Sequence, residues 1–127
     1  TRRRAMELLQ KESELQNIVQ LIGPDAIPEK ERLVLDAAKM IREDFLQQFA
    51  FDPIDASISL KKQYLMLKVI LHYYDKAAAE LAGQMPYDKI VGIKEKESIA
   101  QLKRVPENEI EKKCSEIMHS IDKSLSK

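Results

Sequence analysis

Apolar residues recur along this chain at intervals of three and four, and Pro or Gly repeatedly interrupts the pattern. Such spacing gathers apolar side chains on one face of an α-helix, and Pro or Gly marks where a helix begins or ends. No alternating run of β-branched residues bounded by turn residues, the pattern typical of a strand, is found in the sequence. The pattern therefore predicts an all-α fold built as a helical bundle.

The interruptions predict where the helices lie. The first helix is expected from about residue 4 to Ile22 and the second from Pro28 to about Gln48, with an irregular stretch at 49–59. A third, long helix should follow from Ser59 to Gly83, then one turn at 87–91, a short helix at 95–103 and a last helix opened by Pro106. We expect an antiparallel helix pair, a third long helix against it and a C-terminal helical hairpin.

The residues expected to be buried lie on the apolar stripes of these helices. Helix by helix, they are Leu8, Leu15, Ile18, Val19 and Ile22; Leu33, Val34, Ala37, Ala38, Ile41 and Phe45; Leu60, Tyr64, Leu67, Leu71, Tyr74, Ala78 and Leu81; Ile99 and Leu102; and Ile110, Cys114, Ile117, Ile121 and Leu125. The 127 residues are enough for one domain. We expect residues 1–127 to form one helical domain, with 1–84 as its main bundle and 85–127 as the terminal hairpin.

Composition excludes several classes of protein. The 21 basic and 21 acidic side chains cancel, so no nucleic-acid partner is expected. No apolar run is long enough to span a membrane, and no signal peptide is recognisable. The single cysteine excludes an internal disulfide framework. Residues 1–55 are net acidic and residues 56–127 net basic, which fits internal complementarity or two partner-facing surfaces of opposite sign.

No catalytic or metal-binding pattern is visible. Neither a GxxxxGK[ST] loop nor a GxGxxG loop occurs. Cys114 and His119 are five residues apart and lack the further Cys or His that a zinc site needs, so no metal site is expected. Cys114 lies on an apolar stripe and is expected to pack in the core. His72 lies beside the stripe of the third helix and is expected to be a surface or boundary residue rather than a ligand.

The remaining charged clusters are expected to be solvated. The basic triplet at residues 2–4 has no wider basic surface around it. Glu12 and Glu14, and likewise Glu43 and Asp44, are near neighbours in sequence and do not face each other on a helix. On these features alone, the chain is a soluble helical domain without catalytic residues of its own.

Three stretches carry more specific information. They read LQNIVQLIGPDAIPEKE at residues 15–31, ERLVLDAAKMIREDFLQQFAFDP at 31–53 and KKQYLMLKVILHYYDKA at 61–77. In this order they resemble the C-terminal helical region of the catalytic A subunit of archaeal A-type and vacuolar-type rotary ATPases. The tail from Ile90 to Lys127 fits the same family, so the resemblance covers essentially the whole chain.

The resemblance implies one domain of a larger subunit. In that family, the parts that bind ATP or ADP with Mg precede this region, so the isolated chain should bind no cofactor and catalyse nothing. Copies of the parent subunit and of a non-catalytic B subunit alternate in a hexamer around a central rotor stalk, on the cytoplasmic face of the cell membrane. The C-terminal region couples ATP synthesis or hydrolysis to rotation of that stalk and to translocation of protons or sodium ions.

Two candidate sites follow from the resemblance. The turn between the first two helices corresponds to the acidic rotor-contact loop of the related F-type enzyme. It comprises Gly23, Pro24, Asp25, Ala26, Ile27, Pro28, Glu29, Lys30 and Glu31. An aromatic residue just after the second helix packs on the adenine of bound nucleotide in the family, which implies Phe51, with Phe49 as a substitute if the register shifts.

One alternative stays open from the residues alone. A free-standing helical adaptor, which binds a partner through an exposed helix face, has the same composition and periodicity. Such an adaptor should be monodisperse, whereas a domain separated from its enzyme should expose apolar surface and self-associate.

Overall fold

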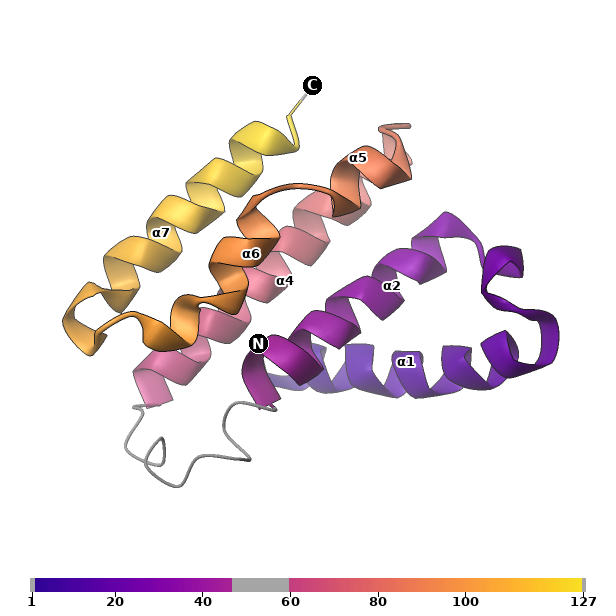
Figure 1. Cartoon of the computed structure of the whole chain (residues 1–127), viewed down its shortest axis with the longest axis horizontal. Helices are drawn as coiled ribbons and strands as arrows, with labels where there is room; N and C mark the ends of the chain where they lie inside the picture. The colour runs from indigo at the N-terminus through magenta and orange to yellow at the C-terminus, as the bar shows by residue number, and fades with distance from the viewer. Residues whose placement is uncertain (1, 47–59, 127) are drawn as a thin grey trace.

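The computed structural model describes residues 2–46 and 60–126 of the chain, and within these ranges it contains helices and no strand. The long helices are α1 (Arg2–Ile22), α2 (Glu29–Met40), α4 (Leu60–Ala82) and α7 (Glu107–Ser124). The shorter elements are η1 (Pro24–Ala26), η2 (Ile41–Leu46), α5 (Tyr87–Val91), α6 (Glu95–Ala100) and η4 (Leu102–Arg104). The all-α bundle predicted from the sequence is confirmed (Figure 1).

Proline fixes the start of three helices. Pro28, Pro86 and Pro106 each directly precede the first residue of a helix, namely α2, α5 and α7. A proline costs nothing there, because the first amides of a helix have no partner inside it. The predicted helix starts are therefore confirmed to within a residue or two.

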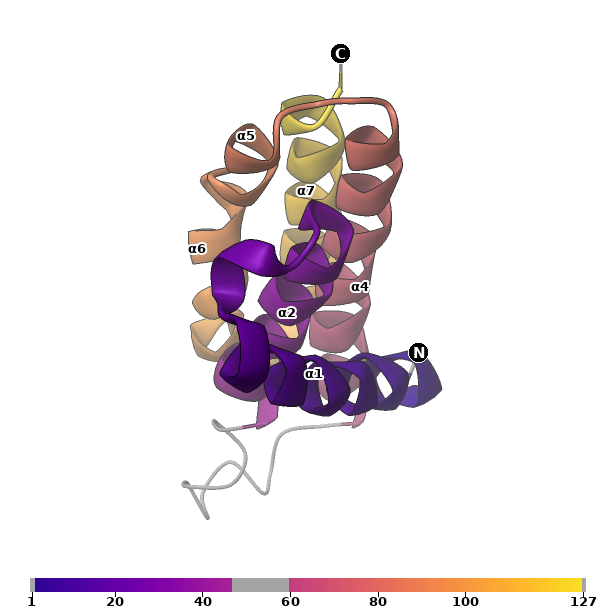
Figure 2. The same ribbon diagram turned by 90° about the vertical axis from the view of Figure 1, so that its right-hand side faces the viewer.

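The long helix α4 lies at the centre of the bundle. α7 runs beside α4 in the same direction, as the ion pairs Lys61–Glu111 (3.0 Å) and His72–Asp122 (2.7 Å) show. α6 runs the opposite way, so that α6 and α7 form the C-terminal hairpin (Figure 1). Figure 2 shows α1 crossing the direction of the other long helices, so the α1–α2 pair is splayed rather than closely parallel.

One apolar core joins all of the long helices. It contains buried residues of α1, α2, α4, α6 and α7, and the largest fully buried side chain is Tyr73. The predicted burial of Leu33, Ala37, Ile110 and Cys114 is confirmed. The side chain of Phe45, the last residue of the predicted stripe of the second helix, lies outside the description of the structure. The division into residues 1–84 and 85–127 stays a prediction.

The predicted burial of four stripe residues is wrong. On α1, Leu8 and Leu15 are buried but Ile18 and Ile22 are exposed, because α2 diverges from α1 toward the turn that joins them (Figure 1). At the start of α4, Leu60 and Tyr64 are also exposed. Helical spacing identifies the face on which these residues lie but not how far a neighbouring helix extends along it.

Glu12 does not lie on a solvated face either. It is only 8% exposed and accepts three hydrogen bonds, of 2.8 to 3.1 Å, from the guanidinium of Arg42. Its neighbour Glu14 is exposed, as predicted. A carboxylate inside an apolar helix face is retained here because an arginine 30 residues away pairs with it in bidentate fashion.

The second helix changes its hydrogen-bonding pattern after Met40, and its predicted end near Gln48 lies outside the described residues. Regular α-helix stops at Met40, and the backbone continues as a π-helical turn, η2, from Ile41 to Leu46. A π-helical turn widens the helix by one residue per turn, which apolar spacing over so short a stretch does not reveal. The irregular stretch predicted at 49–59 lies outside the described residues.

Candidate functional site

The turn between α1 and α2 begins at Gly23. Its φ of +88° lies in the left-handed region that favours glycine. The Gly23 N–H donates to the Val19 carbonyl at 2.8 Å, which satisfies one of the last carbonyls of α1. The helix therefore ends at a defined residue, and the chain turns into η1 without a flexible linker.

The second half of the turn is held by hydrogen bonds to backbone carbonyls. The Pro28 carbonyl accepts from the N–H groups of Glu31 and Arg32, each at 3.0 Å. The Arg32 guanidinium donates to the Asp25 carbonyl at 3.1 Å, while its distance to the Asp25 carboxylate is 4.0 Å. Ile27 is buried beneath these bonds. The turn is thus a fixed structure at the tip of the α1–α2 hairpin.

The three predicted acidic residues of the turn do not share one environment. Asp25 and Glu29 are exposed at the tip. Glu31 is half-buried and lines a crevice of about 330 Å³, together with Arg4 and Lys11 of α1. The structure brings Asp25 and Glu29 to the surface and turns Glu31 toward α1.

The adenine-contact candidates fall outside the description of the structure. Phe51 and Phe49 belong to residues 47–59, which the structure does not describe. The π-helical turn η2 directly precedes them, at the end of the hairpin remote from the tip (Figure 1).

A polar junction joins three helices in the middle of the bundle. The Asp36 carboxylate of α2 accepts from the Tyr73 hydroxyl of α4 at 2.8 Å and from the Lys96 ammonium of α6 at 2.7 and 2.9 Å. The ammonium also lies 5.7 Å from the centre of the Tyr73 ring. Burial, followed by the Asp36 charge, raises the pKa of Tyr73, so the phenol stays a hydrogen-bond donor.

The sequence analysis missed this junction, although one signal was present. Asp36 follows Leu33 by three residues and precedes Met40 by four, so helical spacing places it at the edge of the buried face. A carboxylate there needs a partner from another helix. Lys96 is that partner, 60 residues away, and no local pattern could have identified it.

Two further ion pairs fasten α1 to the bundle. Arg42 of η2 holds Glu12, and the guanidinium of Arg4 binds both carboxylate oxygens of Asp75 on α4, with one of these bonds at 2.8 Å. Both contacts involve the first two thirds of α1. No comparable contact fixes the last turn of α1 among the described residues.

A second polar site lies between α6 and α7. Glu95 is 2% exposed, and its Oε1 accepts from the hydroxyls of Ser120 at 2.9 Å and Ser124 at 2.5 Å. Burial disfavours its charge, but the hydrogen bonds from Ser124, Ser120 and its own backbone, together with the charge of Lys94, outweigh burial and lower the pKa of Glu95. Its Oε2 is buried and accepts no hydrogen bond within the described part of the chain. A surface cavity of about 610 Å³ adjoins this carboxylate.

A metal centre and a reactive thiol were the remaining candidates in the described part of the chain. The described residues hold no group of three His, Cys, Asp or Glu side chains that could bind a metal. Cys114 is buried, and burial raises the pKa of its thiol to about 11. The prediction that this cysteine packs in the core is confirmed.

Comparison with known sequences decides the family. Residues 1–91 match the family described as the C-terminal domain of V and A type ATP synthase. The chain belongs to this family. It is 49% identical to the A subunit of the A-type ATP synthase of Methanopyrus kandleri over 121 residues, which is 95% of this chain and 20% of that protein. It is 48% identical to the corresponding protein of Methanosphaera stadtmanae over 125 residues, or 98% of this chain and 21% of that protein.

This domain of the V and A type ATP synthase family thus spans about a fifth of the length of its relatives. The resemblance inferred from residues 15–31, 31–53 and 61–77 is confirmed by the family match. The helices that the structure describes include none long and apolar enough to cross a bilayer.

Proposed function

We propose that this chain is the C-terminal domain of the catalytic subunit of an A-type rotary ATP synthase. In this proposal the domain couples ATP synthesis or hydrolysis to rotation of a central stalk, and thereby to translocation of protons or sodium ions. The observation that carries the proposal is the family match over residues 1–91, which includes the whole α1–α2 hairpin.

The shape of the hairpin supports a mechanical role. α1 is 21 residues long, which corresponds to about 30 Å of helix, and it ends in a turn held by backbone hydrogen bonds. The pairs Asp36–Lys96 and Arg4–Asp75 fasten α2 to α6 and α1 to α4, and Glu12–Arg42 ties α1 to η2 within the hairpin. A rotation of the bundle would therefore displace the tip rather than bend the hairpin.

The tip is the proposed rotor contact. It comprises residues 23–31, of which Asp25 and Glu29 present exposed carboxylates. Exposed ion pairs with a basic shaft contribute about 0–1 kcal/mol each and are screened by salt. Such weak contacts suit a surface that releases its partner in every cycle.

Nucleotide binding belongs mainly to other parts of the parent subunit. The chain has no phosphate-binding loop of its own. We propose that the parent subunit binds ATP or ADP with Mg and that Phe51, or Phe49, contributes an aromatic face to the adenine. Its neighbours would be non-catalytic B subunits in an alternating hexamer, at the cytoplasmic face of the membrane.

The free-standing adaptor is the weaker alternative. It explains the exposed apolar residues of α1 equally well. It does not explain why residues 1–91 match a domain family of rotary ATP synthases.

Cross-linking from the tip tests the proposal. In the assembled complex, Ala26→Cys is labelled with a photoreactive maleimide, which spares Cys114 because that thiol is buried. We expect a covalent product with the central shaft, identified by mass spectrometry. A matched label at Lys112→Cys, exposed on α7, should leave the shaft unlabelled. If Ala26→Cys never reaches the shaft at any nucleotide concentration, the proposed function is wrong.

A further inference from the structure

The Glu95 carboxylate between α6 and α7 is only partly satisfied by hydrogen bonds. Its Oε1 accepts from the Ser120 hydroxyl at 2.9 Å and from the Ser124 hydroxyl at 2.5 Å. Its Oε2 is buried and has no hydrogen-bond partner among the described residues. A buried acceptor without a donor costs free energy, and the cost is larger when the acceptor carries a charge. The structure therefore leaves one unused acceptor at this site.

The same carboxylate also lacks a counter-charge in direct contact. The lowered pKa of Glu95 keeps the group ionised at neutral pH. Two comparable carboxylates, those of Glu12 and Asp36, each form an ion pair with a basic residue of another element. The charge of Lys94 favours the ionised form of Glu95, but Lys94 is exposed and forms no ion pair with it in the described ranges. A buried charge is stable only when it is paired, so this site fits a cation that the chain itself does not supply.

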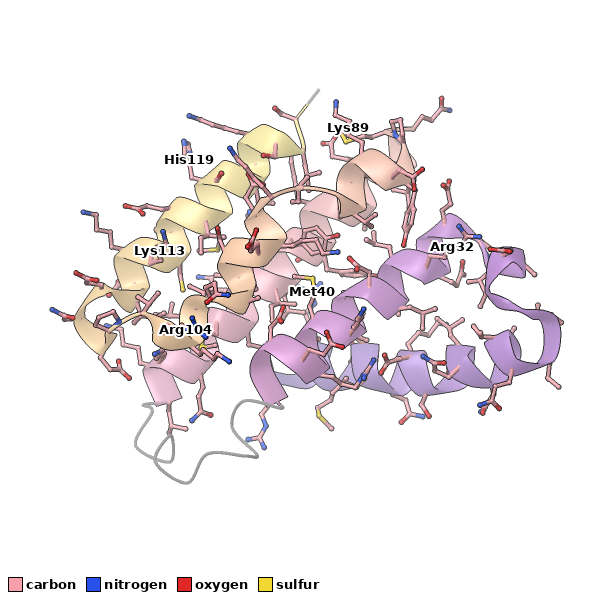
Figure 3. All side chains as sticks on the ribbon, viewed as in Figure 1. Arg32, Met40, Lys89, Arg104, Lys113 and His119 are labelled. Carbon is pink, nitrogen blue, oxygen red and sulfur yellow. The ribbon has the colours of Figure 1, made fainter. Side chains whose placement is uncertain are left out.

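A cavity of about 610 Å³ lies in the groove between α6 and α7, beside the carboxylate. Figure 3 shows these two helices side by side. Both Glu95 and its hydrogen-bond donor Ser120 line the cavity, and Val105 and Ile117 give it an apolar wall. Its volume falls within the range of pockets that hold small ligands. The cavity therefore has room for a cationic group together with the alkyl chain that carries it.

The remaining charges of the cavity favour a cation. Its lining contains three carboxylates, of Glu95, Glu97 and Glu116, and two ammonium groups, of Lys94 and Lys113. The carboxylates are thus in excess, and Glu95 is the one that is buried. The described residues hold no group of three acidic, His or Cys side chains that could bind a metal ion. A nitrogen cation, whose N–H groups donate to single acceptors, fits this arrangement better than a metal ion.

We propose that the groove between α6 and α7 binds an alkylammonium or alkylguanidinium group, which donates an N–H to Oε2 of Glu95 and rests its alkyl chain on Val105 and Ile117. The cation belongs either to a free small molecule or to a Lys or Arg side chain of an adjoining polypeptide, since both present the same chemistry. This inference does not depend on the proposed function.

An NMR titration of the chain labelled with ¹³C-glutamate tests the site. At pH 7, methylguanidinium chloride should shift the Cδ resonance of Glu95 along a saturation curve, with half-saturation at about 1–10 mM for one small cation. Tetramethylammonium chloride carries the same charge without an N–H donor and should leave this resonance in place. Equal responses to the two salts, or a shift that does not saturate, would show that no N–H cation binds Oε2, and the inference would be wrong.

Two isosteric variants locate the binding. Glu95→Gln keeps an oxygen for the two serine hydroxyls but replaces Oε2 by an NH₂ group, which cannot accept. The amide resonances of Ser98 and Ser120, both in the cavity lining, should shift with methylguanidinium in the unmodified chain and not in this variant. The control is Glu97→Gln, which removes an exposed carboxylate of the same cavity and should change the half-saturation concentration less than twofold.

The opposite pattern, with binding lost in Glu97→Gln and kept in Glu95→Gln, would overturn the inference, because the cation would then be held at the surface. If Glu95→Gln fails to fold, the comparison of the two salts on the unmodified chain still decides.

The assembled complex distinguishes the two sources of the cation. Gln101→Cys places a thiol in the exposed part of the cavity lining, while Cys114 is buried and does not react. If a side chain of an adjoining polypeptide occupies the groove, maleimide should label Gln101→Cys at least tenfold more slowly in the complex than in the isolated chain. Equal rates would assign the cation to a free small molecule.

Discussion

At the scale of single residues, the surroundings of two carboxylates could not be predicted from the sequence. Glu12 and Asp44 are both predicted to be solvated, but Glu12 is buried against Arg42 and Asp44 is half-buried. The periodic pattern of apolar residues does not predict the burial of a polar residue whose partner lies on another element. By contrast, Gly23 is predictable, since the Gly–Pro pair marks a helix end and the structure places it at positive φ.

Asp44, in the π-helical turn η2, holds its proton to a higher pH than an ordinary aspartate. Burial, followed by the charge of Glu43, raises the pKa of Asp44 from 3.8 to about 6. The folded protein therefore holds this proton more tightly than the unfolded chain, so its stability falls as the pH rises from about 4 to above 6. We expect Asp44→Asn to abolish that decrease, which amounts to about 1–2 kcal/mol for a half-buried group.

Urea unfolding of the chain at several pH values between 4 and 8 measures this effect. The difference in unfolding free energy between Asp44→Asn and the unmodified chain should grow with pH and level off above about pH 7. Two parallel pH profiles would show that Asp44 titrates normally.

Phe51 is the residue for which the family makes the sharpest functional prediction. If its ring packs on adenine, Phe51→Ala in the intact enzyme should raise the KM for ATP about tenfold, because an aromatic face and its buried area are lost. Steady-state ATP hydrolysis measures the change, and Phe49→Ala is the control. A raised KM in the Phe49 variant alone would assign the adenine contact to Phe49.

At the scale of elements, periodicity and proline positions predict most of the helices. Pro28, Pro86 and Pro106 locate three helix starts, and α4 and α7 extend over the stretches predicted to be helical. The crossing of α1 over the bundle and the π-helical turn η2 could not be predicted. Both depend on packing between elements, about which the pattern within a single element carries no information.

The junction of Asp36, Tyr73 and Lys96 joins α2, α4 and α6 through side-chain contacts. Asp36→Asn leaves the half-buried Lys96 ammonium without its counter-charge and should lower the free energy of unfolding by about 2–3 kcal/mol. Tyr73→Phe removes one hydrogen bond and should cost about 1 kcal/mol. Urea unfolding measures both, and equal small losses would mean that the Asp36–Lys96 charge pair contributes nothing.

For the whole molecule, the sequence alone is sufficient to predict the fold class and the family. The order of the residues in 15–31, 31–53 and 61–77 carries the family resemblance, and the match over residues 1–91 confirms it. The surface of the hairpin tip is less predictable. The resemblance implies a rotor contact in the acidic turn, which stays a prediction, whereas the exposure of Ile18, Leu21 and Ile22 is visible only once the helices are seen to diverge.

In our proposal, the whole domain acts as a rigid connection between the rest of the catalytic subunit and the shaft. Polar junctions fasten the α1–α2 hairpin to the bundle at one end, and in our proposal the exposed tip contacts the shaft at the other. A rigid connection of this kind transmits motion and does not itself catalyse ATP synthesis or hydrolysis. Changes at the tip should therefore separate hydrolysis from rotation.

Single-molecule rotation of the assembled complex tests this coupling role most directly. The variant combines Leu21→Ser and Ile22→Ser, in the last turn of α1, with Asp25→Ala and Glu29→Ala in the tip, and all four positions are exposed. We predict that ATP hydrolysis continues while the torque on the shaft falls severalfold. Full torque from this variant at an unchanged rate of hydrolysis would contradict the coupling role, because the shaft would then be driven without the tip.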